Sequence, residues 1–69
     1  MKNPIYKIVE ITGTSPASME DAVVGVIKRA RKTIKNLSWF QVIETRGNIE
    51  KEKIQWQVTI KVGFAVENR

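Results

Sequence analysis

The sequence of 69 residues contains no cysteine and no histidine. Disulfides are therefore excluded, and the usual zinc, haem and iron–sulfur sites are too, so we expect no metal site. The same absences remove the most common general base and the best thiol nucleophile, and we expect a protein that is not an enzyme. No apolar run approaches the roughly 20 residues of a membrane span, and the start, MKNPIYKIVE, lacks the apolar segment of a signal peptide. We therefore expect a cytoplasmic protein.

The short length limits how much apolar surface the chain can bury. We expect one domain, 1–69, and a domain of this size buries only about 60% of the surface of its unfolded chain. Small domains usually gain the missing stability from a disulfide, a metal or a partner subunit. Because nothing in the sequence supports the first two, we expect a homo-oligomer.

The charge balance is basic. Twelve Lys and Arg residues face seven Asp and Glu residues, which gives a net charge of +5 and an isoelectric point near 9.9. Such a balance suits an anionic partner, whether nucleic acid, an acidic surface or a phosphorylated small molecule. It also serves solubility, and composition does not decide between these uses.

Hydrophobic periodicity predicts three strands. The β-branched residues at 5–12 predict the first strand, and Gly13 with the following Ser-Pro predicts a turn after it. Residues 38–47 predict the second strand, and residues 48–53 extend its pairing before a charged turn. Strict alternation over 54–66 predicts the third strand, with one face toward a core and the other wetter.

Between the first two strands, apolar residues spaced by three and four predict an amphipathic helix at 19–35. Ser18 is its expected N-cap. Gly25 lies inside this helix at a cost of up to about 1 kcal/mol relative to alanine, so we expect another element to approach it closely. The face opposite the apolar stripe carries Lys28, Arg29, Arg31, Lys32 and Lys35.

The element order β-α-β-β predicts an α+β fold. The simplest arrangement places the third strand in the middle of a three-stranded antiparallel sheet packed on the one helix. One helix covers one face, so the second face stays open. Its central strand is not strongly charged and suits contact with another subunit or a flat ligand.

Trp39 and Phe40 are adjacent, so their side chains point to opposite faces of the second strand. If Phe40 and Val42 join the helix-facing core, Trp39 lies on the open face beside Gln57. An indole next to an amide suits a planar heteroaromatic ligand, and it equally suits an anchor between subunits. The parity of Arg46 places it with Phe40, so it reaches this site only through a bulge near Gly47 or from a neighbouring subunit.

Three separated stretches, VEITGTSPASMEDAV, ARKTIKNLSWFQVIETRG and WQVTIKVGF, together resemble the dodecins. These are small β-α-β-β proteins that bind flavins, and the resemblance runs from Tyr6 to Val66. It implies a hollow assembly of twelve copies with the helices outward. It also implies paired flavins stacked between symmetry-related tryptophans, here Trp39. Gln57 matches the glutamine that hydrogen-bonds the flavin ring.

Arg46 matches an arginine of the bacterial-type members, which implies a preference for FMN over riboflavin. Some similar proteins bind coenzyme A, so coenzyme A is a further possible ligand, although the resemblance implies no particular residues for it. Trp56 stands where the family often has tyrosine or phenylalanine, and Ser38 stands where aspartate is common. The resemblance implies flavin storage and sequestration, with quenching of the excited flavin by the adjacent indole. It implies neither membrane binding nor flavin chemistry.

Two other functions stay open. The cations of the predicted helix could form a nucleic-acid or acidic-partner binding surface. Few of these residues could read bases and no aromatic lies among them, which disfavours nucleic acid as the principal partner. The third alternative is an oligomeric structural protein without a ligand.

Overall fold

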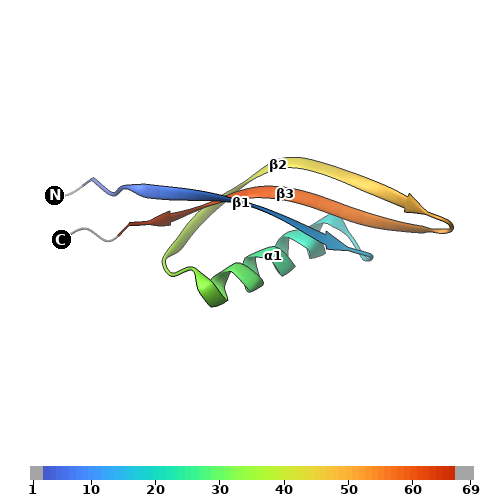
Figure 1. Cartoon of the computed structure of the whole chain (residues 1–69), viewed down its shortest axis with the longest axis horizontal. Coiled ribbons are helices and arrows are strands. Elements are labelled where there is room, and N and C mark those ends of the chain that lie inside the picture. Colours follow the sequence, from blue (N-terminus) through green and yellow to red (C-terminus); the bar gives the residue numbers. More distant parts are fainter. Residues whose placement is uncertain (1–2, 67–69) are drawn as a thin grey trace.

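The computed structural model describes residues 3–66 and shows one helix packed on one face of a three-stranded antiparallel sheet (Figure 1). The elements of this part of the chain are β1 (Tyr6–Ser15), α1 (Met19–Thr33), β2 (Leu37–Glu50) and β3 (Lys53–Ala65). Their order in the sheet is β1-β3-β2. The predicted element order and the central position of the last strand are confirmed.

The first strand does not end where the glycine predicted. β1 continues through Gly13 and Thr14 to Ser15, which pairs with Trp56 of β3. Gly13 is therefore not a turn residue. A Cβ at this position would collide with the side chain of Val26 in α1, so the glycine allows the helix to lie close to the strand.

Ser15 organises the passage from β1 into the helix and is almost completely buried, at 2% exposure. Its hydroxyl donates to Asp21 Oδ2 at 2.7 Å and accepts from the amide of Ala17 at 2.9 Å. Ser18 is the N-cap, as predicted, and its Oγ accepts from the amide of Asp21 at 3.0 Å. Two serines thus satisfy polar groups at the helix start.

The helix ends at Thr33, earlier than the predicted residue 35, and Ile34 is already extended. Asn36 then takes a φ of 65°, a left-handed conformation that asparagine tolerates well. The expected close approach to Gly25 is wrong, because nothing lies within 4 Å of a Cβ built there. The close approaches in this fold occur at glycines of the sheet.

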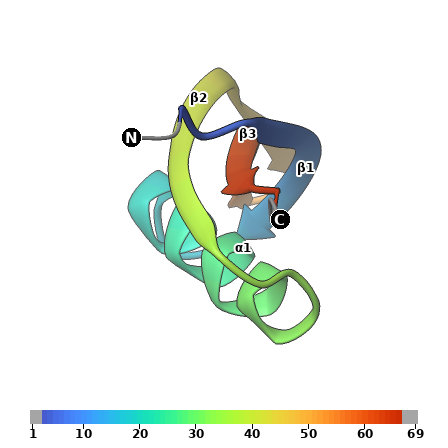
Figure 2. The ribbon, with the colours of Figure 1, turned by 90° about the vertical axis from the view of Figure 1, so that its left-hand side faces the viewer.

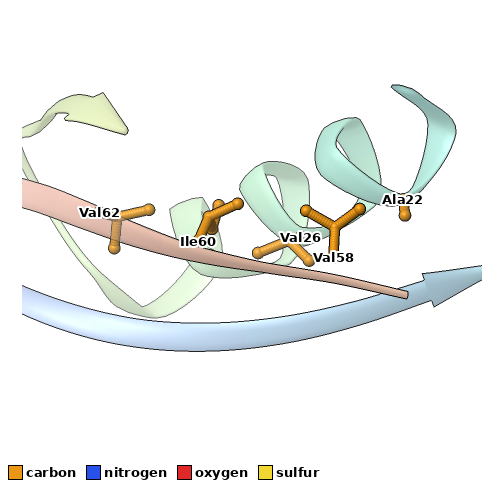
Figure 3. Close-up of a cluster of buried hydrophobic side chains, with 5 residues drawn as sticks. All are labelled: Ala22, Val26, Val58, Ile60 and Val62. Atoms are coloured by element: carbon orange, nitrogen blue, oxygen red, sulfur yellow. The ribbon is translucent and has the colours of Figure 1, made fainter. Parts of the chain in front are cut away.

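The core lies between α1 and the inner face of β3 (Figure 3). Val58, Ile60 and Val62 are essentially fully buried and point toward the helix, as the alternation predicted. Ala22 and Val26 meet them from α1. Met19, Val23, Ile27, Leu37 and Ile11 pack around this cluster and are only partly buried.

The molecule is elongated (Figure 1), and its sheet is strongly twisted (Figure 2). Its radius of gyration is 14.4 Å, whereas a compact domain of this length has about 11 Å. β2 and β3 extend beyond the end of β1 as a two-stranded arm, in which Asn48, Ile49 and Glu50 pair with the start of β3 (Figure 1). This arm confirms the predicted extension of the hairpin. No helix among residues 3–66 is long and apolar enough to cross a membrane.

The two glycines next to and within α1 should respond oppositely to an added methyl group. Gly25→Ala should raise the free energy of unfolding by up to about 1 kcal/mol, because it improves helix propensity and meets open space. Gly13→Ala should lower it by about 1–3 kcal/mol, because Val26 must move. Urea denaturation at one fixed protein concentration measures both. A destabilising Gly25→Ala would show that another copy packs against that side of the helix.

Candidate functional site

The open face of the sheet carries an indole against its central strand. Trp39 pairs with Gly63 of β3. Gly63 follows the buried Val62, which faces the helix, so Gly63 faces the open side of the sheet. A Cβ at Gly63 would collide with the indole ring, so the missing side chain lets Trp39 lie directly on the strand. The prediction that Trp39 lies on the open face is confirmed.

The indole retains an accessible surface in the single chain. Trp39 is 39% exposed, and its ring meets the ring of Tyr6 edge-on, with the centroids 6.1 Å apart. Ile8 pairs with Gly63 from the other side and is also exposed. Trp39, Tyr6 and Ile8 therefore form an apolar platform near one end of the open face, which we call the aromatic end.

A β-bulge in β2 corrects the predicted position of Arg46. The pairing shifts at Ile43, between Val42 opposite Ile60 and Glu44 opposite Thr59. An extra residue in one strand moves the side chains of all later residues in that strand to the opposite face of the sheet. Arg46 therefore pairs with Gln57 and lies on the open face, not with Phe40. The required bulge exists, but it comes earlier in the strand than the expected position near Gly47.

Arg46 and Gln57 lie side by side in a polar group that also contains Asn48. The Nδ2 of Asn48 donates to the Oε1 of Gln57 at 3.3 Å. This hydrogen bond occupies one acceptor site of the Gln57 amide and leaves its NH₂ group free to donate. Sequence reasoning missed Asn48, because only the bulged register brings it to this face. We call Arg46, Gln57 and Asn48 the polar end.

The aromatic end and the polar end do not form one pocket within a chain. Gly63, beneath Trp39, and Gln57 are six residues apart on β3. At a rise of about 3.3 Å per residue their separation is about 20 Å. The expectation that Trp39 lies beside Gln57 is therefore wrong for a single chain, although both lie on the same face. A flat ligand can touch both groups only if they come from different copies.

The inner side of β2 is also incomplete in one chain. Phe40 and Val42 face the helix side, as predicted, but Phe40 is 47% exposed and Val42 is similarly open. The helix packs over β1 and β3, so β2 receives little cover from it. Phe40 instead lines a shallow groove with Ile27 and Arg31.

The carboxylates do not gather into an ion site in the part of the chain that is described. Among residues 3–66, no group of three or more Asp, Glu, His or Cys side chains is placed to hold a metal ion. The aromatic end and the polar end together thus offer an indole, a phenol ring, two amides and a guanidinium to a ligand.

The comparison with known families decides what kind of protein this is. The family model described as Dodecin matches residues 5–67. The chain belongs to the dodecin family. This membership confirms the resemblance seen in the three sequence stretches, and the β-α-β-β fold agrees with it.

Several dodecins resemble the chain over nearly its whole length. Dodecin of Thermus thermophilus is 44% identical over 64 residues, which cover 91% of this chain and 93% of that protein. The structure of dodecin from Streptomyces coelicolor matches with a TM-score of 0.91 at 40% identity and covers both chains completely. Calcium dodecin of Mycobacterium tuberculosis matches with a TM-score of 0.82 at 31% identity, over 91% of each chain, and its structure is described as having a novel calcium-binding site.

The contact between Trp39 and Gly63 predicts a sensitive position on the dodecin open face. Gly63→Ala should displace the indole and lower the free energy of unfolding by about 1–3 kcal/mol. In a Trp56→Phe background, the fluorescence of Trp39 alone should report the displacement. Gly47→Ala is the matched control, since its Cβ would meet Ile54 at an ordinary 3.6 Å. An unchanged Trp39 emission in Gly63→Ala would contradict the close contact.

Proposed function

We propose that this chain binds FMN by stacking the flavin ring on Trp39, in sites that are completed between copies of a homo-oligomer. The observation that carries the proposal is the placement of Trp39 on the bare backbone of Gly63, with its ring still accessible. An exposed indole held against a strand is a rigid apolar surface for a planar heteroaromatic ring. Riboflavin shares that ring and should bind to the same surface.

The polar end supplies the hydrogen bonds that a stacked flavin needs. The flavin ring carries carbonyl oxygens, which require hydrogen-bond donors when they are buried. The NH₂ group of Gln57 is a suitable donor, because the hydrogen bond from Asn48 uses only the carbonyl oxygen and leaves the NH₂ free. Arg46 adds a guanidinium that suits the phosphate of FMN, which riboflavin lacks.

Assembly is part of the proposal because the two ends are about 20 Å apart on one chain. A second copy must bring its polar end to the aromatic end of the first. Large apolar side chains exposed in the single chain supply the surface for this association. Ile49 in the arm is 84% exposed and pairs with the half-exposed Ile54. The resemblance to dodecins implies twelve copies.

The proposed role is storage of the flavin rather than chemistry on it. A ring enclosed between indoles of different copies is shielded from water and from substrates. The same contact places an electron-rich indole against the excited flavin, which suits quenching of absorbed light. Arg46, Gln57 and Asn48 orient the ring in this role, and none of them needs to transfer a proton.

Replacing Trp39 tests the stacking role. Stacking of a planar base on an aromatic side chain contributes about 1–3 kcal/mol, so Trp39→Ala should weaken FMN binding by about 5- to 150-fold. Titration of the flavin-free protein with FMN and riboflavin, followed by flavin and Trp fluorescence, measures this. In the unsubstituted protein, both flavin and Trp fluorescence should be quenched on binding, and the titration should saturate near one flavin per chain. Trp56→Phe is the control, because Trp56 lies on the other face. Equal binding by Trp39→Ala would refute the proposal.

Mixing two defective variants tests whether copies share the site. Trp39→Ala lacks the aromatic end, and the double variant Arg46→Ala/Gln57→Ala lacks the polar end. Assemblies co-expressed from both should contain some sites with both ends intact, and a tight-binding fraction should reappear in the FMN titration. If each site came from one chain, every site in the mixture would be defective. The absence of a tight-binding fraction would therefore contradict a shared site.

A further inference from the structure

The exposed surface of α1 and the segment just after it carry positive charges that the proposed flavin site does not use. We call Lys28, Arg29, Arg31, Lys32 and Lys35 the basic cluster, and all five side chains are exposed. The sequence contains no acidic residue between Asp21 and Glu44. Asp21 is about 10 Å from Lys28 along the helix axis, and its carboxylate accepts a hydrogen bond from Ser15. No acidic residue of the helix is therefore placed to balance the cluster.

Stabilisation of the helix by charges in its last turn explains only part of this cluster. Arg31 and Lys32 lie in the last turn, where cations complement the helix dipole. Lys28 and Arg29 lie a turn earlier, beyond the range of that effect. Lys32 follows them at spacings of four and three, at which like charges on a helix repel. The arrangement thus costs helix stability, and a bound polyanion would relieve the repulsion.

The positive surface continues onto the sheet beyond the end of α1. Lys35 and Lys7 of β1 line the same depression, together with Asn36 and Phe64. Lys7 is exposed and pairs with Phe64 of β3. Cations from β1 and from the segment that follows α1 therefore border one depression.

We propose that the basic cluster binds the phosphate backbone of nucleic acid without reading its sequence. Lysine and arginine bind phosphate oxygens, and duplex DNA presents one negative charge per about 1.7 Å of its axis. The helix contains no aromatic residue, so it has neither a stacking platform for bases nor an anchor typical of protein interfaces. On its outer side only Val24 is a large exposed apolar residue, which is too little for insertion into a lipid surface.

This surface is separate from the flavin site and its partner is different. The cluster has few residues that could read bases, which disfavoured nucleic acid as the principal partner. For the same reason, the binding proposed here involves only the phosphate backbone and is independent of sequence. Backbone contacts need only cations at the surface, and an oligomer would present one cluster per copy. Binding of several clusters to one duplex would be strengthened by their high effective concentration.

The test is fluorescence anisotropy of a labelled mixed-sequence DNA duplex with the full-length protein, from about 50 to 200 mM salt. Affinity should fall linearly in a log–log plot against salt. Lys28→Gln/Lys32→Gln should reduce the slope by about two for each copy that touches the duplex. Lys51→Gln/Lys53→Gln, in the arm, removes the same charge and should leave the slope unchanged. Two duplexes of unrelated sequence should bind equally well.

Three results would overturn the proposal. The first is a salt slope that Lys28→Gln/Lys32→Gln does not change, and the second is an equal reduction by both double variants, which would indicate net charge alone. The third is binding of polyglutamate as tightly as DNA of the same charge, which would indicate an acidic protein partner. Both variants should keep their FMN affinity, so this test is independent of the flavin proposal.

Discussion

A single helix of 15 residues is about 22 Å long, whereas the strands of the β2–β3 hairpin each extend over about 45 Å. The helix can therefore cover only part of one face of the sheet, over β1 and β3. It buries Val58, Ile60 and Val62 completely, and it leaves Phe40, Val42 and the apolar pair in the arm exposed. The chain thus has a small, well-packed core and leaves many large apolar side chains exposed, which is the surface that the proposed association would cover.

The same constraint determines where a ligand can bind. The helix occupies one face of β3, so the opposite face is left for Trp39, Gln57 and Arg46. These residues lie at two ends of that face, so the proposed flavin site needs a second copy to bring the ends together. In that proposal, stability and binding have a common origin in association. The basic cluster is exposed and takes no part in the proposed flavin site.

The sequence predicted the element order, the position of β3 and the buried residues, because alternation in β3 and the spacing in α1 directly reflect burial. It also predicted the open face for Trp39. It did not predict the face of Arg46, because that face depends on the bulge at Ile43. The bulge depends on how β2 and β3 pair along their length, and no single residue in the sequence indicates it. The expected roles of Gly13 and Gly25 were both wrong for a related reason. Gly13 and Gly25 look alike in sequence, and only the packed helix shows which of them is crowded.

The bulges of β2 also affect what can happen at its unpaired edge. β2 is an edge strand, and a long, regular, apolar edge would be a template for strands of other molecules. The irregularities at Ser38 and Ile43 divide its pairing into the short segments 39–42 and 44–50 and increase its local twist. A strand added from outside would have to reproduce both shifts to pair along the whole edge. The bulge that turns Arg46 toward the open face thus also keeps the edge of β2 from pairing with another strand along its whole length.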